Sequence, residues 1–120
     1  MKPLTVEDVL EGLEKAVEKR GEDFVYPSEW MTGFEGSCQY FLPNGDAACI
    51  IGEVFAGHGI KLSDLSDREN ITGVSSGFFS RFFADEDAQI IACEAQGAQD
   101  AQSTWGKSLT AARKFAKVIR

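Results

Sequence analysis

The chain of 120 residues has no apolar run that approaches the ~20 residues of a membrane-spanning helix. We therefore expect no membrane partner. The first residues lead into an acidic amphipathic segment instead of a basic and then apolar one, so we expect no signal peptide. The three cysteines are an odd number, and without an export signal they indicate reduced thiols in a cytoplasmic protein.

Histidine is almost absent, which limits nucleophilic catalysis. Cys49 is expected in the first turn of a helix, where a thiolate is favoured, and His58 is the single histidine available as a base. Nine residues of continuous helix separate them by about 13 Å, whereas a nucleophile and its base need roughly 3 Å. We therefore interpret Cys49 as a small buried hydrophobe and keep a small cysteine-dependent enzyme using Cys49 as an alternative.

Close pairs of metal ligands are also missing. Cys38, Cys49, Cys93 and His58 are far apart in the sequence, and none forms the C-x-x-C pair typical of structural zinc sites. A disulfide between Cys38 and Cys49 would fit across a hairpin, but a reducing cytoplasm argues against it. No phosphate-binding glycine loop of known spacing is present. We expect no metal and no cofactor.

The last 20 residues have no acidic side chain. Residues 1–100 carry 19 acids and seven bases, a charge of −12, and residues 101–120 add +5, so the net charge is −7. An acidic body argues against a general nucleic-acid binder, although a nucleic-acid mimic stays open. The basic tail is expected either to dock on this body or to bind a partner. Its cations are Lys107, Arg113, Lys114, Lys117 and Arg120.

Apolar periodicity predicts a mainly helical chain. Residues 6–20 and 105–119 both show one apolar face at helical spacing, and Asp85-Glu86-Asp87 is typical of a further helix start. Residues 47–56 are apolar on nearly every side, which predicts a helix enclosed by its neighbours. Strand-like composition before a Pro-Asn-Gly turn favours a minor β-hairpin near residues 38–48.

Two residues of the central segment have specific predicted roles. Asp46 is expected to cap the helix at 47–56. Gly52 costs about 1 kcal/mol relative to alanine within a helix, so we expect it to permit close packing of another element. The fold predicted is therefore a single α+β domain over residues 1–120, mainly α, with four to five helices packed around the helix at 47–56.

Aromatic residues are plentiful in two segments. Tyr26, Trp30 and Phe34 lie in an irregular stretch, and we consider them candidates for an exposed contact surface. The Phe78–Phe83 run places four phenylalanines on one wide helical stripe. We expect this stripe to fill the core, with an exposed patch as the alternative.

Five short motifs occur together in this chain: Arg20-Gly-Glu-Asp-Phe-Val-Tyr26, Cys38-x-Tyr40, Gly45-x-x-x-Cys49-Ile-Ile-Gly52, Ala98-Gln-Asp100 and Thr104-Trp-Gly106. Together they resemble a group of small uncharacterised proteins encoded by actinobacteria and their phages. Many members carry proline two residues before the second cysteine of the pattern, where this chain has Ala47. The resemblance implies a cytoplasmic protein of phage origin and brings no activity, cofactor or catalytic residue.

These observations favour a non-catalytic protein-binding or regulatory protein, a phage-encoded effector of a host protein. The alternatives are the Cys49-dependent enzyme and a nucleic-acid mimic or binder. The expected partner is a protein, nucleic acid is disfavoured, and homo-oligomerisation stays open. The candidate contact residues are Tyr26, Trp30, Phe34, Lys107, Arg113, Lys114 and Lys117.

Overall fold

A computed structural model describes residues 2–30 and 39–119. It contains four α-helices in these ranges: α1 (Val6–Arg20), α2 (Ile50–Gly57), α3 (Glu86–Asp100) and α4 (Trp105–Ile119). Short 3-10 turns connect them: η1 (Ser28–Trp30), η3 (Leu62–Asp64), η4 (Glu69–Ile71) and η5 (Gly77–Phe82). The predicted mainly helical class is confirmed.

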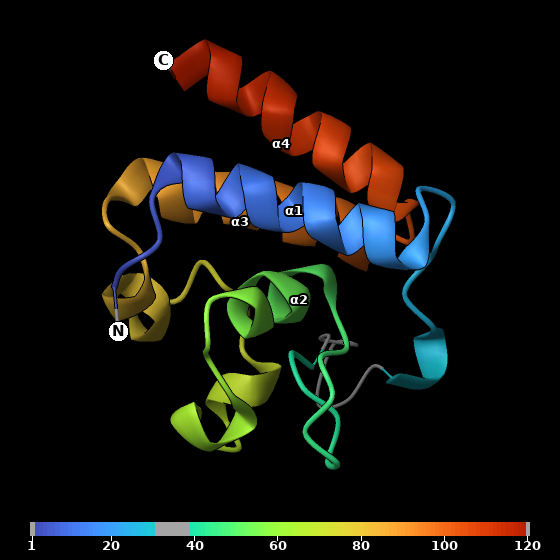
Figure 1. The fold of residues 1–120 in the computed structure, drawn as a ribbon, viewed down its shortest axis with the longest axis vertical. Coiled ribbons are helices and arrows are strands. Elements are labelled where there is room, and N and C mark those ends of the chain that lie inside the picture. The colour runs from blue at the N-terminus through green and yellow to red at the C-terminus, as the bar shows by residue number, and fades with distance from the viewer. Residues whose placement is uncertain (1, 31–38, 120) are drawn as a thin grey trace.

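The helices form three layers (Figure 1). α1 and α3 pack against each other in the middle layer, and α4 covers one side of this pair. α2 packs on the other side, against both α1 and α3. α2 is buried as predicted. The centre of the fold, however, is formed by α1 and α3, which both contact α2 and α4.

α1 and α3 both begin at an N-cap whose side chain accepts a hydrogen bond from a backbone N–H of the first helical turn. At the start of α1, the Thr5 hydroxyl accepts from the Asp8 N–H at 3.1 Å, and the Asp8 carboxylate accepts from the Thr5 N–H at 3.0 Å. The second hydrogen bond is the main reason that the pKa of Asp8 lies below its ordinary value. Asp85 caps α3 by accepting from the Ala88 N–H at 2.9 Å. These local signals place both helix starts correctly.

The predicted β-hairpin near residues 38–48 is wrong. Among residues 39–48 there is no strand, only an isolated antiparallel bridge between Phe41 and Ala47 around a tight turn. The physical reason is that the Tyr40 N–H donates to the Asn70 carbonyl at 3.1 Å instead of to Ala48, and that the chain then enters α2 at Ile50. The Phe41 N–H and carbonyl face away from Ala47, and the buried side-chain amide of Asn70 accepts from the first and donates to the second, both at 2.9 Å. A side chain thus takes the backbone hydrogen bonds that a neighbouring strand would otherwise make.

The predicted Asp46 cap is also wrong, and the helix begins later than residue 47. α2 starts at Ile50, and its N-cap is Cys49, whose Sγ accepts from the Gly52 N–H at 3.3 Å. Asp46 is exposed and accepts from the side chain of Asn44 within the turn. Residues 47 and 48 are used instead to close the turn, since the Ala48 N–H donates to the Tyr40 carbonyl at 2.8 Å.

Gly52 permits the close approach that its position in an apolar helix predicts. A Cβ atom built there would lie 2.0 Å from the carbonyl oxygen of Tyr40. The backbone of residue 40 therefore lies directly against α2, and position 52 has no room for any side chain.

Two glutamines of α3 connect the loops to the core, and the sequence pattern had not indicated either role. Gln99 is fully buried, and its side-chain oxygen accepts from the N–H of Ile50 at 2.7 Å, at the start of α2. Gln96 accepts from the Val74 N–H at 2.7 Å and donates to the Tyr40 hydroxyl at 2.9 Å. These amides satisfy polar groups that burial would otherwise leave without a partner.

Replacing Gln99 with methionine is expected to lower the free energy of unfolding by about 2 kcal/mol, because it keeps the shape but leaves the Ile50 N–H buried and unpaired. The matched control is Thr110→Val, which removes an exposed side-chain hydrogen bond to Gly106 of 3.0 Å and is expected to cost less than about 0.5 kcal/mol. Urea unfolding of both variants measures the difference. Equal losses would show that the Gln99 amide is not needed at this site.

The Phe78–Phe83 run packs largely as predicted. Phe79, Phe82 and Phe83 are buried and surround Phe55 of α2, with ring centroids 6.1, 5.4 and 6.2 Å from it. Phe78 is 52% exposed. The segment is a 3-10 turn instead of an α-helix, and it lies beside α2, near the N-terminal end of the chain, where it also contacts α3 (Figure 1).

α4 is docked on the body, as one of the two sequence interpretations expected. Its stripe of Trp105, Leu109, Ala112 and Ala116 is buried. Its first backbone N–H groups are also occupied, because those of Trp105 and Gly106 donate to the carbonyls of Phe24 and Glu22 at 2.8 Å. None of the helices in the described residues is long and apolar enough to cross a membrane.

Candidate functional site

The aromatic candidates do not form an exposed surface. Tyr26 is fully buried, and its hydroxyl donates to the Trp30 carbonyl at 2.9 Å. Trp30 is half-buried with its ring centroid 5.7 Å from that of Tyr26. Tyr26 is therefore not part of an exposed aromatic surface in this structure, and Phe34 lies outside the described residues.

Three aromatic rings, those of Phe24, Trp30 and Trp105, surround Arg20 at the end of α1. The Arg20 guanidinium lies 5.1 Å from the ring centre of Phe24, 5.4 Å from Trp30 and 5.6 Å from Trp105. Its Nη2 donates to the Ala47 carbonyl at 3.1 Å. Because aromatic faces attract a desolvated cation, the aromatic segment and the start of α4 are held together around this side chain.

Arg20 also pairs with Glu53, the single charge of α2. The Glu53 side chain is 6% exposed, and its carboxylate lies 3.3 Å from Arg20 Nε and 3.2 Å from Lys19 Nζ. A buried carboxylate is costly unless it is paired, and here two cations of α1 pair with it. The sequence already showed that Glu53 is the one charged residue of an apolar helix, which indicates that it needs partners. It did not show that those partners are Lys19 and Arg20.

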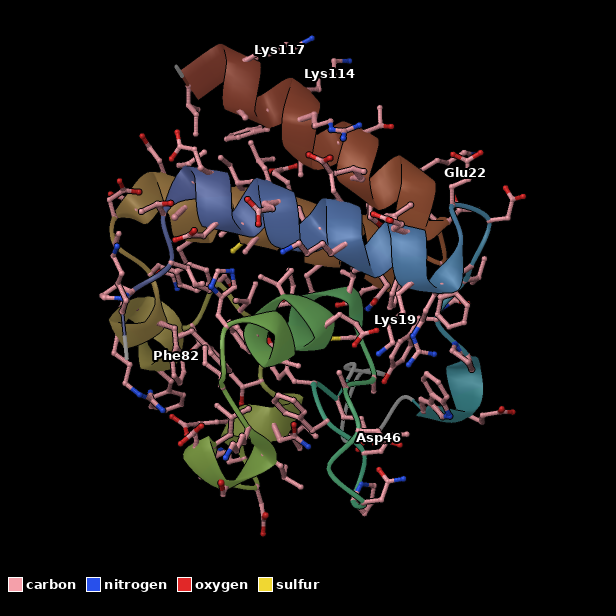
Figure 2. The ribbon with its side chains drawn as sticks, viewed as in Figure 1. Lys19, Glu22, Asp46, Phe82, Lys114 and Lys117 are labelled. Carbon is pink, nitrogen blue, oxygen red and sulfur yellow. The ribbon has the colours of Figure 1, made fainter. Side chains whose placement is uncertain are left out.

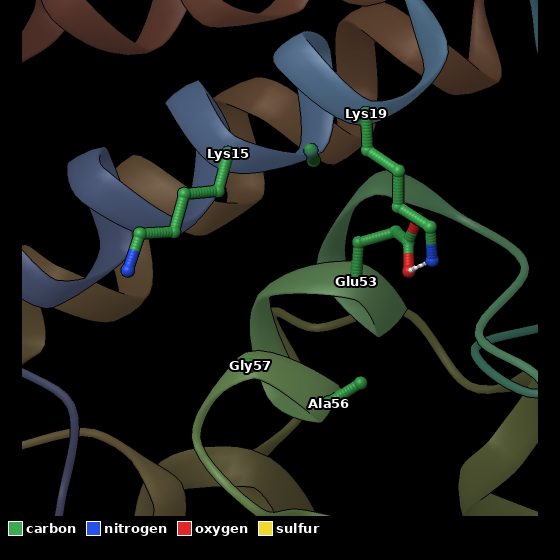
Figure 3. Close-up of a pocket in the computed structure, with 6 residues that line it drawn as sticks. Lys15, Lys19, Glu53, Ala56 and Gly57 are labelled. Carbon is green, nitrogen blue, oxygen red and sulfur yellow. Dashed lines mark hydrogen bonds and ion pairs between the residues drawn. The ribbon is translucent and has the colours of Figure 1, made fainter.

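Beside this ion pair, an open groove of about 290 Å³ runs between α1 and α2 (Figure 3). Lys15 and Lys19 project from α1 along it, and the Lys15 ammonium pairs with Glu11 at 3.0 Å. Because the acidic and basic groups are already paired with one another, the groove offers a ligand little unsatisfied charge. Its lining residues are Lys15, Ala16, Lys19, Glu53, Ala56 and Gly57.

Cys49 does not meet the requirements of a nucleophile. Its side chain is fully buried, and its sulfur caps α2 from within the core. Cys93 is half-buried, and burial, with the Glu94 charge second, raises the pKa of its thiol. A raised pKa leaves less thiolate at neutral pH, so neither thiol is prepared for attack on a substrate.

In the part of the chain that the structure describes, no three His, Cys, Asp or Glu side chains gather closely enough to hold a metal ion. The acidic residues of α1 also do not make a continuous anionic face. Glu11 pairs with Lys15, as its i,i+4 spacing predicts, and Glu14 lies 3.5 Å from Arg113 of α4. Interleaved cations argue against a nucleic-acid mimic on this helix.

The cations of α4 divide into two places. Arg113, Lys114 and Lys117 are exposed in its C-terminal half, and we call these three residues the basic patch (Figure 2). Lys107 lies near the other end of α4, in a depression that it shares with Glu22 and Asp23. The structure thus brings together three of the four predicted cations and places the fourth in acidic surroundings.

Two members of the basic patch have no acidic partner. Lys114 and Lys117 make no ion pair with any residue in 2–30 or 39–119, and α4 itself contains no acid. Arg113 pairs with Glu14, but both side chains are about half exposed, at 50% and 56%. Such an exposed pair contributes little and exchanges easily for another partner.

A second groove lies next to the basic patch, between α1 and α4. It has a volume of about 370 Å³ and is lined by Leu10, Arg113, Ala116 and Lys117. Leu10 is half-buried and Ala116 is buried, so apolar surface meets two exposed cations here. The sequence pattern had identified the cations, but not the groove, because its second wall comes from α1.

Comparisons of the chain with protein-family models, with curated proteins and with solved structures gave no match. The resemblance to actinobacterial and phage proteins therefore stays a prediction.

Proposed function

We propose that this protein is a non-catalytic binding protein that contacts an acidic region of another protein through the basic patch of α4. The observation that carries the proposal is a pair of exposed lysines, Lys114 and Lys117, that have no ion-pair partner within residues 2–30 and 39–119, on a chain of net charge −7. In an acidic protein, an unneutralised cationic face favours encounter with an acidic surface and suppresses encounter with others.

The same geometry argues against the other partners of a basic helix. A membrane-surface helix inserts its apolar face into lipid, but that face of α4 is buried against α1 and α3. Nucleic acid is bound through many phosphate contacts, and the patch offers three cations beside the glutamates of α1. A protein segment with a few carboxylates matches the size and charge of the patch.

On the resemblance given by the sequence motifs, we propose further that the partner is a host protein in the cytoplasm of an actinobacterium and that the protein is a phage-encoded effector. The buried Cys49 sulfur and the paired charges around Glu53 support a role without catalysis. No cofactor enters this proposal.

The double variant Lys114→Glu/Lys117→Glu is expected to bind the partner at least about tenfold more weakly, since each reversed charge then faces an acidic group of the partner. The matched control is Lys2→Glu/Lys61→Glu, which changes the net charge equally at exposed positions outside α4. Pull-down from an actinobacterial lysate with wild type and both variants measures the recovered partner. Equal recovery by the two double variants would contradict the proposal.

A further inference from the structure

We infer that the groove between α1 and α4 receives an apolar side chain from an acidic amphipathic helix of the partner. This inference rests on the proposed function and adds the form of the partner segment. Its basis is that apolar and cationic groups share one recess, formed by Leu10 and Ala116 together with Arg113 and Lys117.

The combination of groups identifies the chemistry of the occupant. A volume of about 370 Å³ has room for a large aliphatic or aromatic side chain, which would cover the exposed part of Leu10. A purely apolar occupant would leave the cations beside it without partners. A purely acidic occupant would leave the apolar surface in contact with water. An acidic segment with one apolar side chain provides partners for the cations and also covers the apolar surface.

The spacing of the cations favours a helical segment. Arg113 and Lys117 are four residues apart on α4, which corresponds to about 6 Å along the helix axis. Carboxylates four residues apart on a second helix have the same rise, so a helix aligned with α4 can pair with both cations at once. Peptide helices that dock in grooves between two helices use such repeating anchors.

Other segments of the same chain fit this description less well. The exposed face of α1 is made of charged residues, including Glu7, Glu11, Glu14 and Glu18, and offers no apolar anchor. Val118, which is 76% exposed, belongs to α4 itself and is flanked by a lysine. Neither of these two segments supplies an acidic helix with an apolar anchor, and the occupant that we propose is a segment of a distinct protein.

The test uses a synthetic helical peptide with glutamates at i,i+4 spacing around a single leucine. We expect the amide signals of α4 and of Leu10 in ¹⁵N spectra to shift on titration. Changing the peptide leucine to serine is expected to weaken binding at least about tenfold, because the apolar contact is lost. This comparison leaves the protein unaltered and so does not depend on how a variant folds.

The variant Ala116→Leu, which fills the groove, is expected to weaken binding by a similar factor. Ala56→Leu is the matched control, since it fills the groove between α1 and α2 at an exposed position. Circular dichroism and thermal unfolding of both variants establish that each is folded.

The outcomes separate this inference from the function on which it rests. Suppose that Lys114→Glu/Lys117→Glu abolishes peptide binding, while neither the leucine-to-serine change in the peptide nor Ala116→Leu weakens it. The basic patch would then still be the contact surface, but the proposed role of the groove would be wrong. Absence of any peptide binding to the wild type would also overturn it. So would shifts at the groove that appear with anionic vesicles, with DNA or with rising protein concentration instead of with the peptide.

Discussion

Replacing Gly52 with alanine is expected to lower the free energy of unfolding by about 3 kcal/mol or more. The added Cβ atom would lie 2.0 Å from the Tyr40 carbonyl oxygen and 2.9 Å from its carbonyl carbon. Both are backbone atoms, so no change of rotamer relieves the overlap. The turn at residues 39–48 must move away from α2, which also disrupts the hydrogen bond from Ala48 to Tyr40 of 2.8 Å.

Gly57→Ala is the matched control for this substitution. It lies on the same helix, and nothing is within 4 Å of a Cβ built there. Alanine is the better helix former, so this variant is expected to be neutral or to gain up to about 1 kcal/mol. Chemical unfolding of the two variants decides the question, and a Gly52→Ala variant as stable as Gly57→Ala would show that the Tyr40 contact is not tight.

Replacing Arg20 with methionine is expected to cost about 3 kcal/mol, because the Glu53 carboxylate would lose its better buried partner. Arg20 also donates to Ala47 and lies over three aromatic rings, so its removal also loosens the packing around Trp105. The measurement is the free energy of unfolding together with Trp fluorescence. A red shift of the emission is expected as the rings become hydrated.

Lys19→Met provides the contrast on the same carboxylate. The Lys19 side chain is 65% exposed, whereas that of Arg20 is 23% exposed, so the lysine pair is expected to contribute less than about 1 kcal/mol. Adding Glu53→Gln to Arg20→Met is expected to recover part of the loss, since no charge is then left buried. If Arg20→Met and Lys19→Met were equally mild, the aromatic cluster would not depend on the arginine.

The sequence predicted those elements whose signals are local. α1 and α4 have the bounds expected, because Thr5 and Thr104 lie before apolar stripes at helical spacing and no tertiary contact is needed to see them. The close approach at Gly52 was also predicted, because a glycine inside a helix lowers its stability and the missing side chain leaves room for a neighbouring backbone.

Elements that depend on distant side chains were not predictable in the same way. The hairpin near residues 38–48 was expected from composition, but the Tyr40 N–H donates to the carbonyl of Asn70, far away in the sequence, instead of to Ala48. Similarly, Gln99 and Gln96 reach residues 49 and 22 positions away. A polar residue in an amphipathic pattern gives no indication of which distant backbone group it will meet.

The candidate site shows the same division. The cations of α4 were identified as a set, since a tail without acids is visible in the sequence. The burial of Tyr26 was not visible in the sequence, and neither was the position of Trp30 beside Arg20, because both depend on contacts made only in the fold. The groove at Leu10 required knowledge of which face of α1 packs beside α4.

Site-specific photocrosslinking tests the proposed contact surface most directly. A photoreactive residue replaces Val118, which is exposed beside Lys114 and Lys117, in one protein sample and Lys61 in another, and both are irradiated in an actinobacterial lysate. The account predicts one discrete adduct with a protein at position 118, attached through an acidic helical segment, and none at position 61. An adduct at position 61 alone, or equal adducts at both, would contradict the assignment of the basic patch as the contact surface.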